Sequence, residues 1–230
     1  MSVEDLQALW LTLKLATSTT FILLVIGLPL SWWLVRSQSL AATVVNVLIA
    51  LPLVLPPTVI GFYLLIAMGP SGPLGALTSS TGLAPLAFSF PGLVFGSVIY
   101  SLPFVIQPLQ AGFASVPQSV LDASNTLGAD SKSLLLRVAI PLSQRAVVVA
   151  SVLGFAHTVG EFGVVLMIGG NIPGETRVAS VQIYDHVEAL DYASAHQLSL
   201  VLVIFSLVVL TAVYRVWGRS VFTQSRHSSA

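Results

Sequence analysis

The stretch DASNTLGADSKSLLLRVAIP, from Asp122 to Pro141, decides how the rest of the chain is organised. It is the longest run between hydrophobic segments that is polar enough to lie in water and patterned enough to fold. Two short helices that meet at Gly128 would form an exposed surface suited to docking a partner. We expect the remaining chain to hold that surface against a membrane.

The first of these helices is expected from Val116 to Leu127, where apolar residues recur at helical spacing. Ser115 can cap its start, Pro117 suits its first turn, and Gly128 can end it.

The second helix begins after Gly128, where Asp130 or Ser131 can act as its cap. We expect Pro141 to stop it, because proline cannot continue the helical hydrogen bonds. Its apolar residues are Leu134, Leu135 and Val138.

The composition indicates an integral membrane protein. The chain has 230 residues, of which 55% are hydrophobic and 8% are charged, whereas soluble domains carry roughly 25% charged residues. A net charge of zero gives a nucleic-acid partner no electrostatic support. The absence of cysteine excludes disulfides and thiolate metal sites.

Five hydrophobic segments are each close to the roughly 20 residues that a helix needs to cross a bilayer. The chain therefore reads as an all-α membrane protein with one domain over residues 1–230 and a cytoplasmic loop at about residues 113–144. The external loops would be residues 69–91 and residues 171–196, the latter with a short helix around 178–187. The five expected spans are residues 11–35, 44–68, 92–111, 146–168 and 198–216.

The basic residues orient these spans. If the spans alternate in direction, seven of the nine basic residues fall on one side of the membrane. The positive-inside rule places that side in the cytoplasm, so the N-terminus lies outside and the C-terminus inside. The seven residues are Arg36, Lys132, Arg137, Arg145, Arg215, Arg219 and Arg226.

Prolines are concentrated in the second span, which contains Pro52, Pro56 and Pro57. Each removes a helical hydrogen bond, which membrane helices tolerate where neighbouring groups replace it. They either set the packing shape of the helix or bend it to line a pathway that opens and closes.

Glu161, in the sequence VGEFG, is the only carboxylate inside an expected span. An acid in the bilayer centre costs about 2.5 to 3.5 kcal/mol on insertion scales and usually faces the interior of a bundle. It could clamp helices that approach closely at Gly160 and Gly163, or it could lie at a pathway or gate. Because a carboxylate binds anions poorly, an anionic substrate favours a structural or gating role.

The sequence offers no convincing catalytic or metal site. His157 precedes Glu161 by one turn, but HTVGE lacks the two histidines of a zinc-protease helix. No glycine-rich phosphate loop is present, so we expect ATP and magnesium to bind a partner and this chain to hold no cofactor. The segment NIPGETR, residues 171–177, predicts a turn in which Arg177 is either solvated or in contact with an acidic partner.

The opening stretch resembles the cytoplasmic EAA loop of the membrane subunits of ABC importers. In that pattern Glu-Ala-Ala is followed after three residues by Gly and after nine more by Ile-x-Leu-Pro. Here Asp122, Ala123 and Ser124 occupy the first positions, Gly128 the glycine, and Val138–Pro141 the end. Aspartate replaces glutamate, serine replaces alanine, and two aliphatic residues are exchanged.

Three further segments are similar to the molybdate ABC-transporter permeases, over about residues 11–218. These are LPLVLPPTVIGFYLL (residues 51–65), FAHTVGEFG (residues 155–163) and NIPGETR. GEFG also occurs in sulfate permeases, whereas NIPGETR is the more molybdate-like element. His157 and Thr158 depart from the family, where Arg and Ser or Ala often stand.

The resemblance implies a type I ABC importer permease in the bacterial cytoplasmic membrane. It would be a homodimer with two cytoplasmic ATPase subunits and an external oxyanion-binding protein, carrying molybdate or tungstate. The residues expected to couple to the ATPase are Val120, Leu121, Asp122, Ala123, Thr126, Leu127, Gly128 and Ala129. Pathway or gate candidates are Pro56, Pro57, Gly160, Glu161, Phe162 and Gly163. Candidates for contact with the binding protein are Asn171, Pro173, Gly174, Glu175 and Arg177.

Three other functions are alternatives to a molybdate permease. A sulfate or thiosulfate permease would share the fold and the GEFG element. A proton-coupled secondary transporter could use Glu161, but five spans without a repeat argue against it. An intramembrane enzyme would need a catalytic constellation that the sequence does not show.

Overall fold

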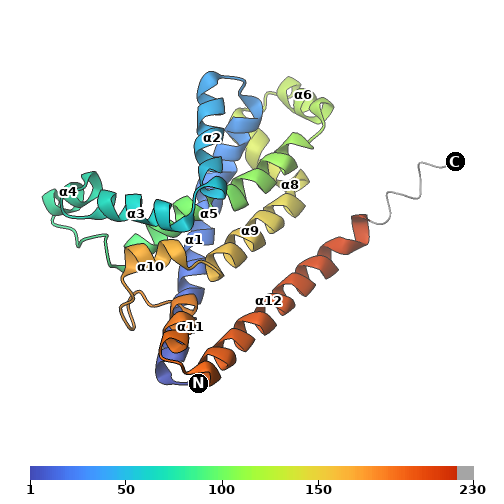
Figure 1. Ribbon diagram of the computed structural model, residues 1–230. Coiled ribbons are helices and arrows are strands. Elements are labelled where there is room, and N and C mark those ends of the chain that lie inside the picture. Colours follow the sequence, from blue (N-terminus) through green and yellow to red (C-terminus); the bar gives the residue numbers. More distant parts are fainter. Residues whose placement is uncertain (222–230) are drawn as a thin grey trace.

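The computed structural model describes residues 1–221, and side chains as far as Thr211. Every regular element in this part of the chain is helical (Figure 1). The α-helices are α1 (Val3–Arg36), α2 (Leu40–Val54), α3 (Pro57–Met68), α4 (Pro73–Ser80), α5 (Phe90–Ala114), α6 (Gln118–Thr126), α7 (Ser131–Ser133), α8 (Ile140–Leu142), α9 (Gln144–Val159), α10 (Gly163–Gly169), α11 (Ala179–Glu188) and α12 (Tyr192–Val221). A π-helix, η1 (Leu134–Ala139), lies between α7 and α8.

Four helical segments are long and apolar enough to cross a membrane, and a fifth is possible if the bent pair formed by residues 131–142 and α9 counts as one span. The expectation of an all-α membrane protein with about five spans is confirmed. The first and third expected spans correspond to α1 and α5, and the last corresponds to α12.

The first helix begins at Val3, several residues before the expected start. Ser2 caps it by accepting a hydrogen bond from the backbone N–H of Asp5, whose side chain in turn accepts from the N–H of Ser2. The helix then continues through Pro29 to Arg36, whose guanidinium lies over the ring of Trp32 at 4.9 Å.

The second expected span was wrong as a single bent helix. It is interrupted at Leu55 and Pro56, which separate α2 from α3. Leu55 is extended, because a residue before proline avoids the helical conformation, and Pro57 then starts α3 at the position where a missing N–H costs least. The expected loop after this span also contains a helix, α4.

The long helix α5 forms the centre of the bundle and lies against α1, α2, α9 and α10 (Figure 1). Val105, Ile106 and Leu109 are fully buried on it. Two polar contacts also hold it to its neighbours. Ser31 of α1 donates to the carbonyl of Ile106 at 3.4 Å, and Gln110 donates to Asn46 of α2 at 2.7 Å.

The fourth expected span was likewise wrong as one helix. It consists of α9 and α10, and residues 160–162 between them are not helical. The chain before α9 is also bent, by 81° at Ser143. Glu161 therefore lies in a break between two helices.

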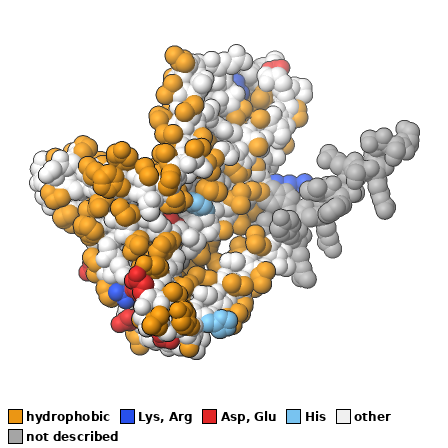
Figure 2. Space-filling view, viewed as in Figure 1, with side chains coloured by type: hydrophobic (Ala, Val, Ile, Leu, Met, Phe, Trp, Pro, Cys, Tyr) orange, Lys and Arg blue, Asp and Glu red, His pale blue; other side chains and the backbone are white. Residues whose placement is uncertain are grey.

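The short helix expected around residues 178–187 is confirmed as α11. It leads into α12, most of whose described side chains are exposed. Figure 2 shows hydrophobic side chains over much of the visible face, and acidic ones near the end of the molecule where the N-terminus lies.

Candidate docking surface and transport cavity

The helix α6 is the core of the predicted docking surface. It begins at Gln118, with Pro117 as its N-cap, and its C-cap is Leu127. The expected start was wrong, because Ser115 ends α5 instead of capping the next helix. Gly128 then adopts φ +81°, the left-handed conformation that glycine takes at little cost.

Most of α6 is exposed. Leu121 is its only buried residue, whereas Val120 and Leu127 are 37% and 88% exposed. The side chain of Gln118 donates to Asp122 at 2.8 Å along the outer surface. The candidate coupling residues therefore form one exposed surface, with Leu121 as the anchor beneath it.

The connection from α6 back to the bundle begins at Asp130, one of the two expected caps, but does not end where expected. Asp130 caps α7 by accepting the N–H of Ser133 at 3.1 Å, and hydrogen bonds from Ser133 lower the pKa of this carboxyl below its usual value. Pro141 was wrong as the stop, since it lies inside α8 and the helical path turns only at Ser143.

A buried apolar cluster joins this surface to the bundle. Leu121 of α6 and Leu134 of η1 share it with Leu109 and Phe113 of α5. Trp32 of α1 completes it and meets the ring of Phe113 edge-on, with centroids 5.6 Å apart. Displacement of α6 would therefore reach α5 and α1 through this cluster, because a close-packed core transmits strain.

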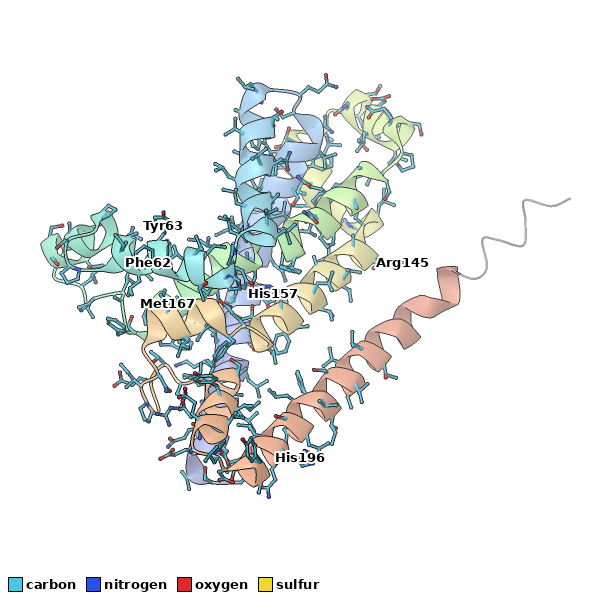
Figure 3. The ribbon with its side chains drawn as sticks, in the orientation of Figure 1. Phe62, Tyr63, Arg145, His157, Met167 and His196 are labelled. Atoms are coloured by element: carbon cyan, nitrogen blue, oxygen red, sulfur yellow. The ribbon has the colours of Figure 1, made fainter. Side chains whose placement is uncertain are left out.

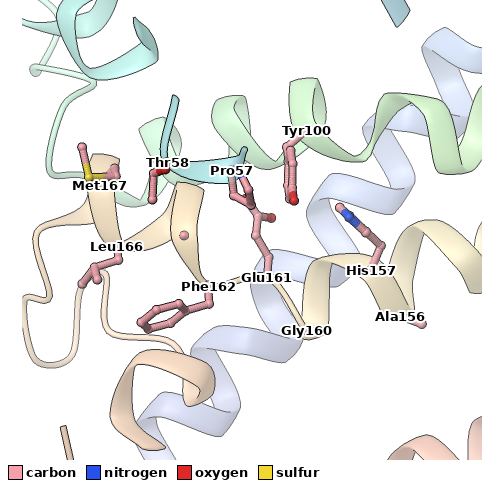
Figure 4. Close-up of a pocket in the computed structure, with 11 residues that line it drawn as sticks. Pro57, Thr58, Tyr100, Ala156, His157, Gly160, Glu161, Phe162, Leu166 and Met167 are labelled. Atoms are coloured by element: carbon pink, nitrogen blue, oxygen red, sulfur yellow. The ribbon is translucent and has the colours of Figure 1, made fainter. Parts of the chain in front are cut away.

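The second site is a cavity of about 550 Å3 between α3, α5, α9 and α10 (Figure 4). Five of the six pathway candidates line it, and only Pro56 does not. Sequence reasoning missed Thr58 and Tyr100, whose hydroxyls carry no signal of their own within an apolar run. The lining residues are Pro57, Thr58, Tyr100, Ala156, His157, Gly160, Glu161, Phe162, Gly163, Leu166 and Met167.

Small residues let the walls of this cavity approach. A Cβ atom on Gly61 of α3 would lie 2.7 Å from Cβ of Met167, and one on Gly163 would lie 2.9 Å from Cβ of Pro57. Both distances are shorter than those that real Cβ atoms keep from neighbouring heavy atoms. Glycine at these two positions thus brings the N-terminus of α3 against α10.

Glu161 is 3% exposed, and neither of its carboxyl oxygens has a hydrogen-bond partner among the described residues. Its side chain points toward Pro57 and Tyr100 in Figure 4. Its backbone is fixed, since its N–H donates to Thr158 at 3.3 Å and its carbonyl accepts from Ser180 of α11 at 2.6 Å. The break between α9 and α10 therefore holds a buried carboxyl group, and the hydroxyl of Ser97 on α5, which lies near it, is likewise buried and unpaired among the described residues.

His157 lines the same cavity from α9. Its Nδ1 lies 2.9 Å from the hydroxyl of Ser101, which in turn lies 3.1 Å from the hydroxyl of Thr158. The imidazole stacks on Phe104 with centroids 3.8 Å apart and lies near Tyr100. Figure 3 shows His157 on α9 and Met167 on α10, on either side of the helix break.

The third candidate site is the segment from Asn171 to Arg177. Arg177 was predicted to be solvated or free for a partner, yet its side chain is only 18% exposed. It donates to the side-chain oxygen of Asn171 at 2.6 Å and lies 3.3 Å from Asp185 and 3.6 Å from Glu4. Arg177 therefore fastens the loop to α1 and α11.

The tip of the same loop is exposed. Pro173, Gly174 and Glu175 lie on the surface, and Gly174 adopts φ +76°. Thr176 beneath them is buried and donates to the carbonyl of Gly169 at 2.6 Å. A second contact ties α1 to α11 at this end, where Asp5 and His186 lie 2.8 Å apart.

Comparison with known proteins identifies the architecture. The permease ModB of Azotobacter vinelandii, named for molybdenum transport, is 54% identical over 93% of this chain and 95% of its own length. The sulfate transport permease CysT of Synechocystis is 32% identical over 85% of this chain and 68% of its own. A solved bacterial ABC transporter for import of the polysaccharide alginate superposes with a TM-score of 0.77, at 18% identity, over 96% of this chain and 81% of that one.

The last comparison shows the fold alone, because its sequence identity is low. The family match covers residues 23–221, which include α6, the cavity and the loop that Arg177 fastens. The chain therefore belongs to the family of binding-protein-dependent transport system inner membrane components.

Proposed function

We propose that this chain is the membrane subunit through which an ABC importer carries molybdate, and also tungstate, into the cell. The single observation that supports this substrate is the 54% identity to a permease named for molybdenum transport, which extends over nearly the whole of both chains. The sulfate permease is more distant and shares less of its length, so sulfate remains the weaker candidate.

We further propose that two copies of the chain assemble in the bacterial cytoplasmic membrane with two ATPase subunits and an external oxyanion-binding protein. The exposed surface of α6 supports an ATPase contact, because it projects from the bundle and rests on an apolar cluster that reaches α5 and α1. ATP and magnesium would bind the ATPase subunits, and this chain would be the conduit. The exposed tip Pro173–Glu175 is the part of the external loop best placed to meet the binding protein.

The mechanism follows from the two sites. Closure of the ATPase subunits would displace α6, and the cluster around Leu121 would pass that movement to α5. The cavity lies against the same helix, at Tyr100. Helix breaks at Leu55–Pro56 and at residues 160–162 supply the points where α3 and α10 can tilt against the bundle.

The test is reconstitution of the chain in liposomes with its ATPase and binding protein. We expect molybdate and tungstate loaded on the binding protein to stimulate ATP hydrolysis and to accumulate inside, and sulfate to do neither. Stimulation by sulfate alone would make this a sulfate permease. Uptake that needs no ATPase and collapses with an uncoupler would instead indicate a proton-coupled transporter.

A further inference from the structure

A buried carboxyl group without a hydrogen-bond partner among the described residues shares the cavity with two hydroxyls. The carboxyl group is that of Glu161, and the hydroxyls are those of the exposed Thr58 on α3 and the partly buried Tyr100 on α5. Native proteins satisfy nearly all of their buried polar groups, and an exception calls for an explanation. Glu161 is such an exception, and the two hydroxyls that line the same cavity indicate a ligand that would accept hydrogen bonds from all three groups.

The surroundings of Glu161 determine whether its carboxyl group is charged or neutral in the cavity. Among the residues whose side chains are described, no lysine or arginine lines the cavity, and the titratable groups that line it with Glu161 are His157 from α9 and Tyr100 from α5. The contributions of α3 and α10, such as Thr58 and Met167, carry no titratable group. An isolated charge in an apolar site is far more costly than a neutral group, so the carboxyl can act as an acid that donates its O–H.

His157 does not add a fourth donor. Thr158 already donates to the carbonyl of Gly154 at 2.9 Å, so Ser101 donates to Thr158 and accepts the Nδ1–H of His157. In the neutral ring, Nε2 is then an acceptor. Among the side chains that line the cavity, the donors available to a ligand are those of Thr58, Tyr100 and Glu161.

The N-terminus of α3 adds a further preference for negative charge. Pro57 and Thr58, its first two residues, both line the cavity. This end of a twelve-residue helix carries a partial positive charge and a free backbone N–H at Thr58, and such ends favour anions.

We propose that the cavity is a transient binding site for the oxyanion in transit, in which Thr58, Tyr100 and the carboxylic acid of Glu161 donate hydrogen bonds to its oxygens. The identity of the anion rests on the proposed function. A volume of about 550 Å3 is within the range of small-molecule pockets, about 300 to 1,000 Å3. A site built from neutral donors holds a dianion without the fixed cation that would hinder its release.

The role of Glu161 is tested by two substitutions in the assembled complex. Glu161→Gln keeps a donor and the shape of the side chain but cannot carry a charge, and we expect uptake within about threefold of the wild type. Glu161→Leu removes the donor, and we expect uptake to fall about tenfold, as one lost hydrogen bond predicts. If Gln and Leu are equally damaging, the charge and not the donor matters, and this part of the proposal fails.

Occupancy of the cavity can be measured directly, because the natural chain has no cysteine. Met167→Cys places a single thiol in the cavity, and Glu188→Cys places a matched control on the exposed end of α11. Both variants would be treated with an anionic thiol reagent, with and without molybdate, in the complex with ATPase and binding protein. We expect molybdate to slow modification of Met167→Cys several-fold and to leave Glu188→Cys unchanged.

Two results would contradict the proposal that the anion binds in this cavity. Modification of Met167→Cys at the same rate with and without molybdate would mean that the anion does not enter, and no modification at all would mean that the cavity admits no anion. If the wild-type complex transports molybdate in the same preparation, such a result rejects the site alone. If the wild-type complex transports no molybdate, it is the proposed substrate that fails.

Discussion

At the scale of single residues, Gly96 shows how tightly α5 meets α10. A Cβ atom at this position would collide with Cδ1 of the fully buried Ile168. We expect Gly96→Ala to lower the free energy of unfolding by about 1 to 3 kcal/mol, the usual cost of overpacking. Ile168→Val removes that Cδ1 carbon, so adding it to Gly96→Ala should restore most of the loss. Thermal unfolding in detergent would check this, and a double variant less stable than Gly96→Ala would contradict the geometry.

Arg177 gives a second prediction at this scale. Its guanidinium reaches Asn171, Gln182, Asp185 and Glu4 together, which the single ammonium group of lysine cannot do. We expect Arg177→Lys to destabilise the protein by about 1 to 3 kcal/mol, which hydrogen bonds to charged groups typically contribute. The exposed Arg145 provides the matched control, since Arg145→Lys should leave the melting temperature unchanged. Equal melting of both variants would show that the network contributes nothing.

The sequence pointed to Glu161 and to Arg177 but not to the geometry around them. It pointed to Glu161 as a mid-membrane acid because the apolar run continues on both sides, and glycines such as Gly160 are common in membrane helices. The helix break there depends on packing against α3 and α11, which no local pattern records. Arg177 was predicted to be solvated or in contact with an acidic partner, and its position within the fold was missed partly because Glu4 lies at the other end of the chain.

At the scale of elements, α6 and the turn after it carry the coupling prediction. Gly128→Pro cannot adopt the positive φ of this position, and Ala123→Glu places a bulky charge on the exposed face of α6. We expect both to abolish uptake while the subunit remains in the membrane. Ala123→Ser, which is small and neutral, should retain uptake. The measurements are transport into vesicles and the amount of subunit in the membrane fraction, and normal uptake by the first two variants would reject the coupling role.

Helices of uniform composition were predictable, and the interruptions were only partly so. α5 and α12 lie close to their expected positions because each is a long apolar run. Pro56 and Pro57 were recognised as a distortion, but proline alone does not distinguish a bend from a break. The start of α6 was misplaced because Ser115 has the chemistry of a helix cap, while its backbone still belongs to the end of α5.

At the scale of the whole molecule, α2 and α3 present an unusual amount of apolar surface. Val47, Leu51, Val54, Phe62 and Tyr63 are all more than 40% exposed. Lipid covers some of such a surface, and a second copy of the chain would cover more. We expect native mass spectrometry of the purified complex to show two copies of this subunit for every two ATPase subunits. A mass that corresponds to a single copy would reject the proposed homodimer.

The membrane architecture could be predicted from composition, because 8% charged residues are too few to cover a surface exposed to water. Soluble domains carry about 25% charged residues. The orientation of the spans stays a prediction, which rests on the placement of seven basic residues. The cavity could not be predicted from the sequence. Its walls come from α3, α5, α9 and α10 and meet only when two interrupted spans lie against each other.

The π-helix η1 has a consequence for insertions and deletions. Its wider turn holds one residue more than an α-helical turn would between α7 and α8. Loss of any one residue from Leu134–Ala139 would allow ordinary α-helical winding, and the segment would still fold. Because the wide turn already holds the extra residue, its loss would leave α6 and α9 in nearly the same relative orientation. A one-residue deletion in η1 should therefore be tolerated, whereas a deletion within α9, where each residue contributes about 100° of rotation, would turn the docking surface away from its original direction.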